Sequence, residues 1–212
     1  GQVTSDAAGQ PTRAPVRKLF DIGGRIAWGA AGSTGLLQTL RAEVDALNGS
    51  ARDPAQLRTR LAGTVIPLQQ RALREFVPHA GAEPAELACI FCWCDASGPR
   101  ILSIPRTGGD HQFHGHHAAI GSGDIFAEST VRSIAPANGA ELTLEQAKMV
   151  AFRAIADAID VAAVFLGPPI QLYVVTRAGA ERVSHEEISS TLAASVAHWK
   201  RRERRALDER ER

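Results

Sequence analysis

Residues 16–35 (Val-Arg-Lys-Leu-Phe-Asp-Ile-Gly-Gly-Arg-Ile-Ala-Trp-Gly-Ala-Ala-Gly-Ser-Thr-Gly) constrain the fold more than any other stretch. Two apolar runs flank the Gly-Gly pair at 23–24, which predicts a hairpin because both glycines can adopt a positive φ. The second run continues into small residues at 29–32, and a helix is predicted from Ser33. Glycines at such a junction allow the backbone to approach another element or a ligand closely. Lys18, near the start of this unit, is a candidate functional cation.

The remaining patterns predict helices that arrive in pairs between groups of strands. The expected helices are residues 33–48, a segment starting at 53–54 and kinked or interrupted at Pro67, 124–134, and two segments that follow capping boxes at Thr143/Gln146 and Ser184/Glu187. The expected strands are 87–95, which is apolar on both faces, 100–104, 111–120 and 170–176. The helix after Thr143 is predicted to bury Ala147, Val150, Ala151, Ala154, Ile155 and Ala158.

Tight turns between strands favour antiparallel sheets, and paired helices favour layers of helix packed on sheet. The predicted fold class is therefore α+β, a four-layer α-β-β-α sandwich of two antiparallel sheets between helix layers. We expect a single domain over residues 1–199, followed by a charged helical extension or tail at 200–212. A solvated helix laced with charge pairs is the simplest interpretation of that tail, and contact with a neighbouring subunit or nucleic acid is an alternative.

Composition excludes several classes of protein. The chain has 212 residues, of which 44% are apolar and 22% charged, and it can form one sizeable core. Its net charge of +1 gives no general indication of nucleic-acid binding. No apolar run reaches the roughly 18 residues needed to span a bilayer, and the polar segment 1–13 is unlike a signal peptide. Only three cysteines are present, too few for a disulfide framework, so we expect a cytoplasmic protein.

Two clusters invite a metal interpretation, and in both we favour a simpler one. Cys89 and Cys92 have CxxC spacing, but residues three apart on a strand point to opposite faces, so buried free thiols are expected. Histidines crowd residues 111–117, where a transition metal is one interpretation and a solvated loop or strand edge is the favoured one. No phosphate-loop motif follows the glycines at 29–35. We therefore expect neither a metal nor a cofactor.

The order of elements, together with several short motifs, resembles the proteasome β-subunit family of N-terminal nucleophile hydrolases. Residues 1–4 (Gly-Gln-Val-Thr) are similar to a stretch of the bacterial ATP-dependent protease peptidase in that superfamily. Residues 17–22 (Arg-Lys-Leu-Phe-Asp-Ile) resemble the Lys-Lys-Leu-Phe-x-Ile of proteasome β chains, which places Lys18 on the catalytic lysine. Residues 31–32 match the family's Ala-Gly, and 120–123 (Ile-Gly-Ser-Gly) match its Gly-Ser-Gly. The resemblance covers nearly the whole chain.

The resemblance also implies roles for individual residues. Lys18 would assist activation of the nucleophile, and Ser122 would orient it. The backbone of Gly32 and the side chain of Thr4 would bind the substrate. Asp160 would belong to the remnant of the family's Asp-x-x-Ser, in which Ala163 replaces the serine. Judged without the resemblance, Lys18 is an ordinary lysine at a strand end, the glycines at 29–35 serve close packing, and Ser122 belongs to a turn.

One departure from the family is serious. The nucleophile there is a threonine at the mature N-terminus, followed by a characteristic aspartate. The resemblance places the first residue of this sequence just after that aspartate, so neither residue is present. The predicted function is a threonine-type endopeptidase subunit in intracellular protein degradation whose nucleophile is absent from this chain. The alternative is a catalytically inactive ring or scaffold subunit, and a metal-binding protein that uses the histidines is a distant third. The family further implies homo-oligomeric stacked rings, an ATP-dependent unfoldase partner and unfolded polypeptide as substrate.

Overall fold

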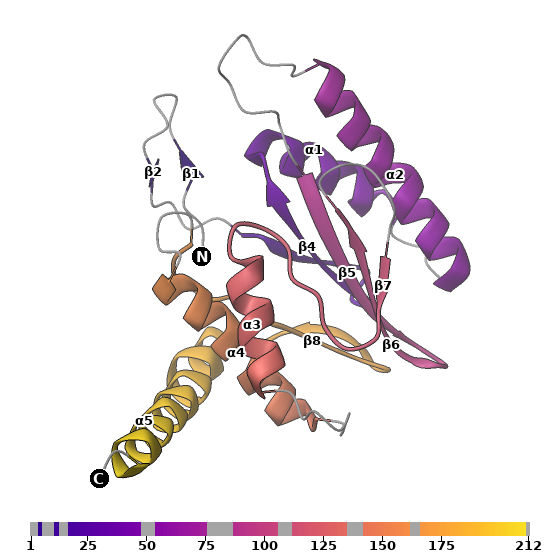
Figure 1. Cartoon of the computed structure of the whole chain (residues 1–212). Coiled ribbons are helices and arrows are strands. Elements are labelled where there is room, and N and C mark those ends of the chain that lie inside the picture. Colours follow the sequence, from indigo (N-terminus) through magenta and orange to yellow (C-terminus); the bar gives the residue numbers. More distant parts are fainter. Residues whose placement is uncertain are drawn as a thin grey trace.

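The computed structural model describes residues 4–5, 11–12, 17–47, 54–75, 87–105, 112–134, 142–161 and 166–210. The central element is a five-stranded antiparallel sheet in the order β3-β4-β5-β6-β7 (Figure 1). Its strands are β3 (Leu19–Ile22), β4 (Ile26–Gly32), β5 (Leu87–Asp95), β6 (Gly98–Ile104) and β7 (Gln112–His114). Two short hairpins complete the strand content, β1 (Thr4–Ser5) with β2 (Pro11–Thr12) and β8 (Tyr173–Thr176) with β9 (Gly179–Arg182).

The predicted hairpin at the start of the sheet is confirmed. Gly23 and Gly24 have φ values of 56° and 63°, the conformation that a two-residue turn between twisted strands requires. The amide of Arg25 donates to the carbonyl of Ile22 at 3.1 Å and closes the turn. The amide of Gly24 donates to a carboxylate oxygen of Asp21, also at 3.1 Å. The turn therefore fixes the register of β3 on β4, and with it the position of the residues that precede β3.

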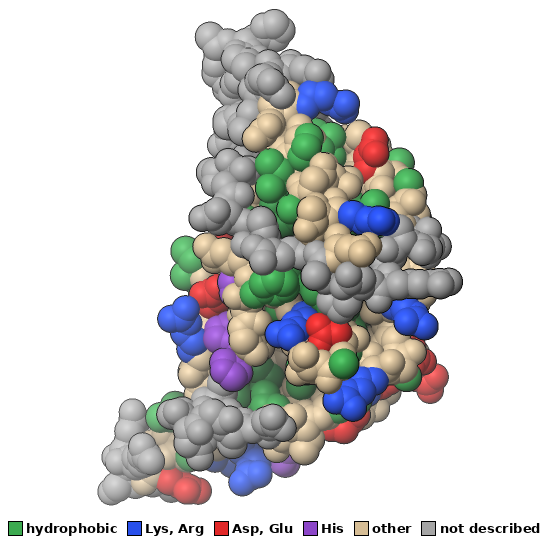
Figure 2. Space-filling model, turned by 90° about the vertical axis from the view of Figure 1, so that its right-hand side faces the viewer, with side chains coloured by type: hydrophobic (Ala, Val, Ile, Leu, Met, Phe, Trp, Pro, Cys, Tyr) green, Lys and Arg blue, Asp and Glu red, His purple; other side chains and the backbone are tan. Residues whose placement is uncertain are grey.

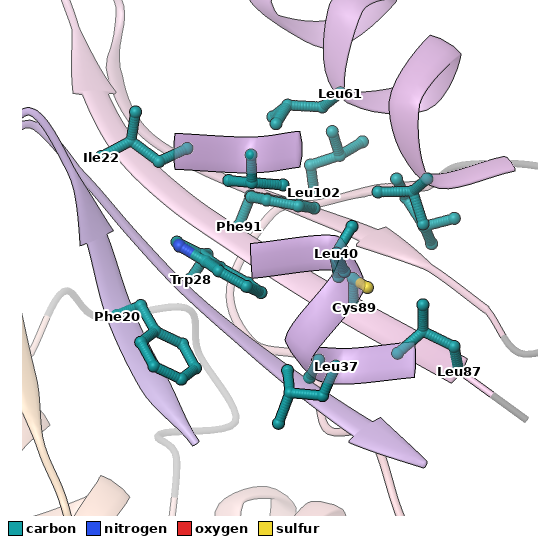
Figure 3. Packing of buried hydrophobic residues seen from close by; sticks show 14 of the residues in the cluster. Phe20, Ile22, Trp28, Leu37, Leu40, Leu61, Leu87, Cys89, Phe91 and Leu102 are labelled. Carbon is teal, nitrogen blue, oxygen red and sulfur yellow. The ribbon is translucent and has the colours of Figure 1, made fainter. Parts of the chain in front are cut away.

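Helices α1 (Thr34–Asp45) and α2 (Pro54–Glu75) cover one face of this sheet (Figure 1). Alternate residues of each strand point toward these helices, so the main core forms between the helices and the sheet (Figure 3). Trp28 lies at its centre, with ring centroids 4.9 Å from Phe20 and 5.9 Å from Phe91. Leu40 of α1 and Leu61 of α2 are fully buried against these rings. Of the two outcomes predicted at Pro67, the interruption is wrong, because α2 continues through this residue as one helix.

The opposite face of the sheet packs against the β8–β9 hairpin, as Figure 1 shows. Beyond the hairpin lie α4 (Leu144–Val161), the π-helical segment η1 (Glu187–Leu192) and α5 (Ala193–Arg210), and α3 (Asp124–Ile134) packs on α4. Phe152, Val183 and Leu192 belong to a second core between hairpin and helices. The α+β class is thus confirmed. The complete four-layer sandwich is not, since the second sheet comprises only β8 and β9 among the described residues.

The capping box before α4 was predicted correctly, whereas the predicted buried face of α4 was partly wrong. The amide of Thr143 donates to Gln146 Oε1 at 2.9 Å, and the amide of Gln146 donates to Thr143 Oγ1 at 3.3 Å, so the capping box is confirmed. Ala147 and Ile155 are exposed, however, and Phe152 is buried in their place. The helix turns Phe152 toward β8–β9, a contact that the sequence pattern of α4 alone does not reveal.

The predicted strand 111–120 is also shorter than expected, because the described strand β7 covers only Gln112–His114. On the face shown in Figure 2, acidic and basic side chains are interspersed, in keeping with the small net charge. No helix in the described part of the chain is long and apolar enough to cross a membrane.

Candidate active site

Lys18 lies immediately before β3, and its main chain is held by a residue from the other layer. The amides of Lys18 and Leu19 both donate to Gln171 Oε1, at 3.2 and 3.3 Å. The lysine side chain is half-buried, and this burial lowers the pKa of its amine from the ordinary value. Within the described ranges, no carboxylate lies within ion-pair distance of the amine. Lys18 is therefore a partly desolvated amine without a compensating charge among those residues.

The loop that carries Ser122 rests on β4 at its C-terminal end. A Cβ atom on Gly121, whose φ is +100°, would lie 3.0 Å from the Cβ of Ala31. The neighbouring Gly123 packs against Leu166 and against α4, since a Cβ on it would lie 2.5 Å from Leu166 Cδ1 and 3.3 Å from the Cβ of Ala158. This double contact places the Gly121–Gly123 loop beside Ala31 and hence close to Gly32, which ends β4 and is exposed. The Ser122 side chain is exposed, as a group that contacts a ligand must be.

A polar cluster that sequence reasoning missed flanks Lys18. Arg17 donates from its guanidinium to the hydroxyl of Tyr173 at 2.7 Å, and that hydroxyl donates to Asp21 Oδ2 at 3.4 Å. The Arg17 guanidinium also lies 4.0 Å from the same carboxylate oxygen. Since Tyr173 belongs to β8, this cluster and Gln171 join the second layer to the first residues of β3 on both sides of Lys18. The two polar residues Gln171 and Tyr173, two positions apart in the predicted 170–176 strand, were the available signal.

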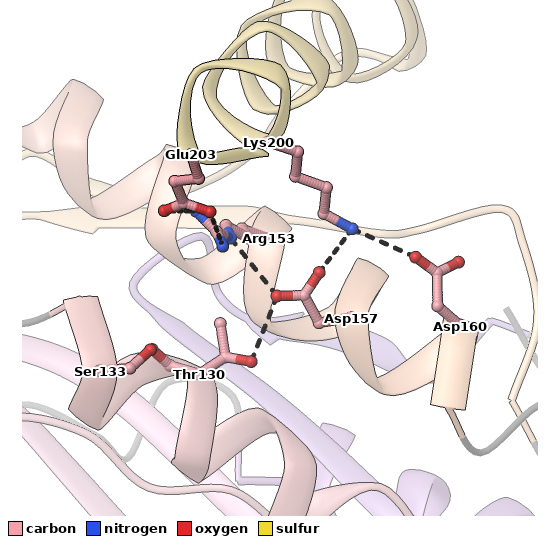
Figure 4. Close-up of polar contacts among 7 residues, drawn as sticks. All are labelled: Thr130, Ser133, Arg153, Asp157, Asp160, Lys200 and Glu203. Carbon is pink, nitrogen blue, oxygen red and sulfur yellow. Dashed lines mark hydrogen bonds and ion pairs between the residues drawn. The ribbon is translucent and has the colours of Figure 1, made fainter. Parts of the chain in front are cut away.

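Asp160 occupies a different environment. Figure 4 shows its carboxylate directed toward α5, where Lys200 Nζ lies 3.1 Å from Asp160 Oδ2. Lys200 also forms an ion pair with Asp157, which accepts a hydrogen bond from Thr130 at 3.3 Å. The Asp160 side chain is 70% exposed. In the described part of the chain, its polar contact is therefore with Lys200 of α5.

The structure describes the remaining candidates only in part. Thr4 pairs with Thr12 in the β1–β2 hairpin. His114 accepts from or donates to the buried Ser103 hydroxyl at 2.7 Å, whereas His111 lies outside the described residues. The described residues contain no group of three potential metal ligands.

The cysteines of β5 are free thiols in the structure. Cys89 is buried in the main core and Cys92 is half-buried, and burial raises the pKa of both, that of Cys92 to about 11. Thiols in this state are poor nucleophiles and poor metal ligands at neutral pH, because both kinds of chemistry need the thiolate.

These features define a protein in which an antiparallel sheet, covered by two helices on one face and by a hairpin and helices on the other, presents a lysine and glycine-rich loops. The family model for proteasome subunits matches residues 4–175. The chain therefore belongs to the proteasome subunit family. No curated protein matches it.

Proposed function

We propose that this chain is a proteasome-like, threonine-type endopeptidase subunit that acts in intracellular protein degradation. The observation that carries the proposal is the state of Lys18. An amine that is half-buried, and for which no described carboxylate compensates, is costly to keep in a fold, and such groups concentrate at functional sites. Membership of the proteasome subunit family supports the same role for Lys18.

The proposed chemistry is acyl transfer. The hydroxyl of an N-terminal threonine attacks the peptide carbonyl, its own amine accepts the proton, and the C–N bond breaks as that proton passes to the leaving amine. Lys18 favours the deprotonated form of the neighbouring groups through its charge. The amide at Gly32 stabilises the oxyanion, Ser122 holds the threonine amine, and Thr4 binds the substrate backbone. The proposal requires a threonine that is not among the residues 1–212, and it needs no metal or cofactor.

The test begins with the protein purified from its natural source. Its intact mass and N-terminal sequence are determined, and cleavage of fluorogenic peptides is measured on the same sample. We expect a mature N-terminal threonine, peptide cleavage, and loss of that cleavage in a Lys18→Met variant. A Lys148→Met variant is the matched control, because Lys148 forms ion pairs with Glu145 and Glu187, which are not candidate site residues. An inert protein that starts at Gly1 would overturn the proposal.

A second candidate is a catalytically inactive ring subunit. The observation that favours it is the contact of Asp160 with Lys200, since the corresponding aspartate of an active subunit would support the catalytic centre. The two candidates differ in the activity of the wild-type protein from its natural source. Peptide cleavage that is lost in Lys18→Met supports the endopeptidase, whereas an inert natural protein supports the ring subunit.

We also propose that the chain assembles into homo-oligomeric stacked rings, as proteasome subunits generally do, and that it receives unfolded polypeptide from an ATP-dependent unfoldase. Exposed apolar side chains on α3 and α4 support an assembled state, because Ile125 and Val161 are 76% and 64% exposed in the isolated chain. Sedimentation velocity tests the assembly. A monomer at micromolar concentration would contradict it, and an Ile125→Glu, Val161→Glu variant should shift an oligomer toward smaller species.

A further inference from the structure

We infer that Gln171 is a positioning residue for Lys18, holding the main chain on which the lysine stands at a fixed place between the two layers. This inference rests on the proposed function of Lys18 and adds to it a residue from the opposite layer. Gln171 acts through Lys18 and is given no contact with substrate.

The geometry of the contact carries the inference. One side-chain oxygen accepts hydrogen bonds from two successive backbone amides, those of Lys18 and Leu19. Two successive amides that converge on one oxygen form a small concave donor site, and an amide carbonyl has the two lone pairs needed to fill it. The partners are 152 and 153 positions apart in sequence, so the contact joins the two layers rather than stabilising a local turn.

The position of β3 in the sheet explains why such a contact is needed. Among the described residues, β3 is an edge strand paired with β4 alone, and Lys18 precedes its first residue. Ladder pairing starts at Leu19, opposite Gly29, and therefore does not include Lys18. Ends of edge strands fray readily when nothing beyond the ladder holds them. Gln171 supplies these hydrogen bonds at Lys18, the residue whose amine has the proposed function.

A second contact, made by Tyr173, holds the chain on the other side of Lys18. Tyr173 lies two residues beyond Gln171, on the same side of an extended chain, and its hydroxyl binds Arg17 and Asp21. Residues on both sides of Lys18 are thus tied to the β8 segment. The backbone at Lys18 can neither slide along nor turn away from the second layer while both contacts persist.

The test uses the three lysines of the chain as three separate probes. Reductive methylation with ¹³C-formaldehyde gives each lysine amine its own NMR signal, and a pH titration gives each pKa. Lys148 and Lys200 are internal controls, because each amine forms ion pairs with two carboxylates and Gln171 is not a partner in any of these pairs. Hydrogen exchange of the Lys18 and Leu19 amides is measured in parallel.

The main variant is Gln171→Met, which keeps the length of the side chain and removes the acceptor. We expect exchange at the two amides to accelerate by about fivefold or more, as for loss of a typical hydrogen bond. The pKa of Lys18 should rise toward its ordinary value as the chain end gains water, while Lys148 and Lys200 titrate as before. Gln171→Glu restores an acceptor oxygen and should restore protection of both amides, which loss of packing alone would not allow.

An unchanged Lys18 titration in Gln171→Met would overturn the inference. If that variant fails to fold, Gln171→Asn replaces it, since the side chain stays polar but its oxygen no longer reaches both amides, and the same outcomes apply. The peptidase assay separates this inference from the proposed function. Inert wild-type protein would overturn the endopeptidase proposal, whereas the positioning of Lys18 is decided by the titration and the exchange rates.

Discussion

The packing of the Gly121–Gly123 loop on β4 can be tested by adding one methyl group at Gly121. Gly121 combines a φ of +100° with close packing, because a Cβ there would lie 3.0 Å from the Cβ of Ala31. The Ala31 Cβ is fixed to a strand in the middle of the sheet and cannot rotate away. Gly121→Ala should therefore combine a backbone penalty with a steric one, and the loop should lift from the strand.

The two penalties can be estimated separately. An L-residue with left-handed backbone costs roughly 1–2 kcal/mol. Overpacking by one methyl group adds about 1–3 kcal/mol, so Gly121→Ala should destabilise the fold by roughly 2–5 kcal/mol. Gly98→Ala isolates the backbone term, since Gly98 has a φ of +118° but no atom within 4 Å of its Cβ position. Gly35→Ala lacks both penalties and should stabilise α1 by up to about 1 kcal/mol.

Urea unfolding followed by circular dichroism measures these differences, and Ala31→Gly in combination with Gly121→Ala supplies the decisive comparison. In the double variant the clashing methyl group is gone, so the steric penalty should disappear. Its free energy of unfolding should then be higher, by about 1 kcal/mol or more, than the sum of the two single effects predicts. If Gly121→Ala costs no more than Gly98→Ala, and Ala31→Gly recovers nothing, the loop is not seated on β4 and the argument that brings Ser122 near Gly32 fails.

Three further outcomes are expected. Phe91→Ala, at a fully buried site in the main core, should cost about 3–5 kcal/mol in urea unfolding, and a cost under 1 kcal/mol would contradict the packing. The hydrogen bond from Arg153 lowers the pKa of the Glu203 carboxyl in the folded protein. The stability that this bond contributes is therefore present above the pKa of the unfolded state and is lost as the pH falls through the pKa of the folded state. Glu203→Gln should make the free energy of unfolding less dependent on pH between pH 6 and pH 3, and an unaltered pH profile would refute this. Cys89 and Cys92 should escape iodoacetamide at pH 8 in the native state and react in urea, as mass spectrometry would show, and rapid native labelling of either would contradict their burial.

Features determined by a few neighbouring residues could be predicted from the sequence. The turn at Gly23 and Gly24 follows from two adjacent residues that tolerate positive φ, and the structure has both there. The capping box at Thr143 and Gln146 likewise depends on side chains three positions apart. The two apolar faces of β5 predicted layers on both sides of it, and the structure places helices on one side and β8–β9 on the other.

Features determined by distant partners could not be predicted in the same way. Ile155 was assigned to the core because it continues an apolar stripe, yet it is 42% exposed, since the direction in which α4 meets β8–β9 decides which stripe is buried. Gln171 and Tyr173 were included in a predicted strand without a function of their own. Their polar groups find hydrogen-bond partners only because the fold brings residues 17–21, more than 150 positions away in sequence, beside them.

The environments of the three lysines of the chain differ in the structure, although the sequence alone does not distinguish them. Lys148 bonds to Glu145 and Glu187, and Lys200 to Asp157 and Asp160, so the charge of each is compensated and its pKa is raised. The pKa of Lys18 is lowered instead, because its amine is partly buried and no carboxylate among the described residues compensates for the lost hydration. A lysine in this state, with hydrogen bonds to its main chain from the opposite layer, gains no ion pair from the described residues, and this supports the role that we propose for its amine.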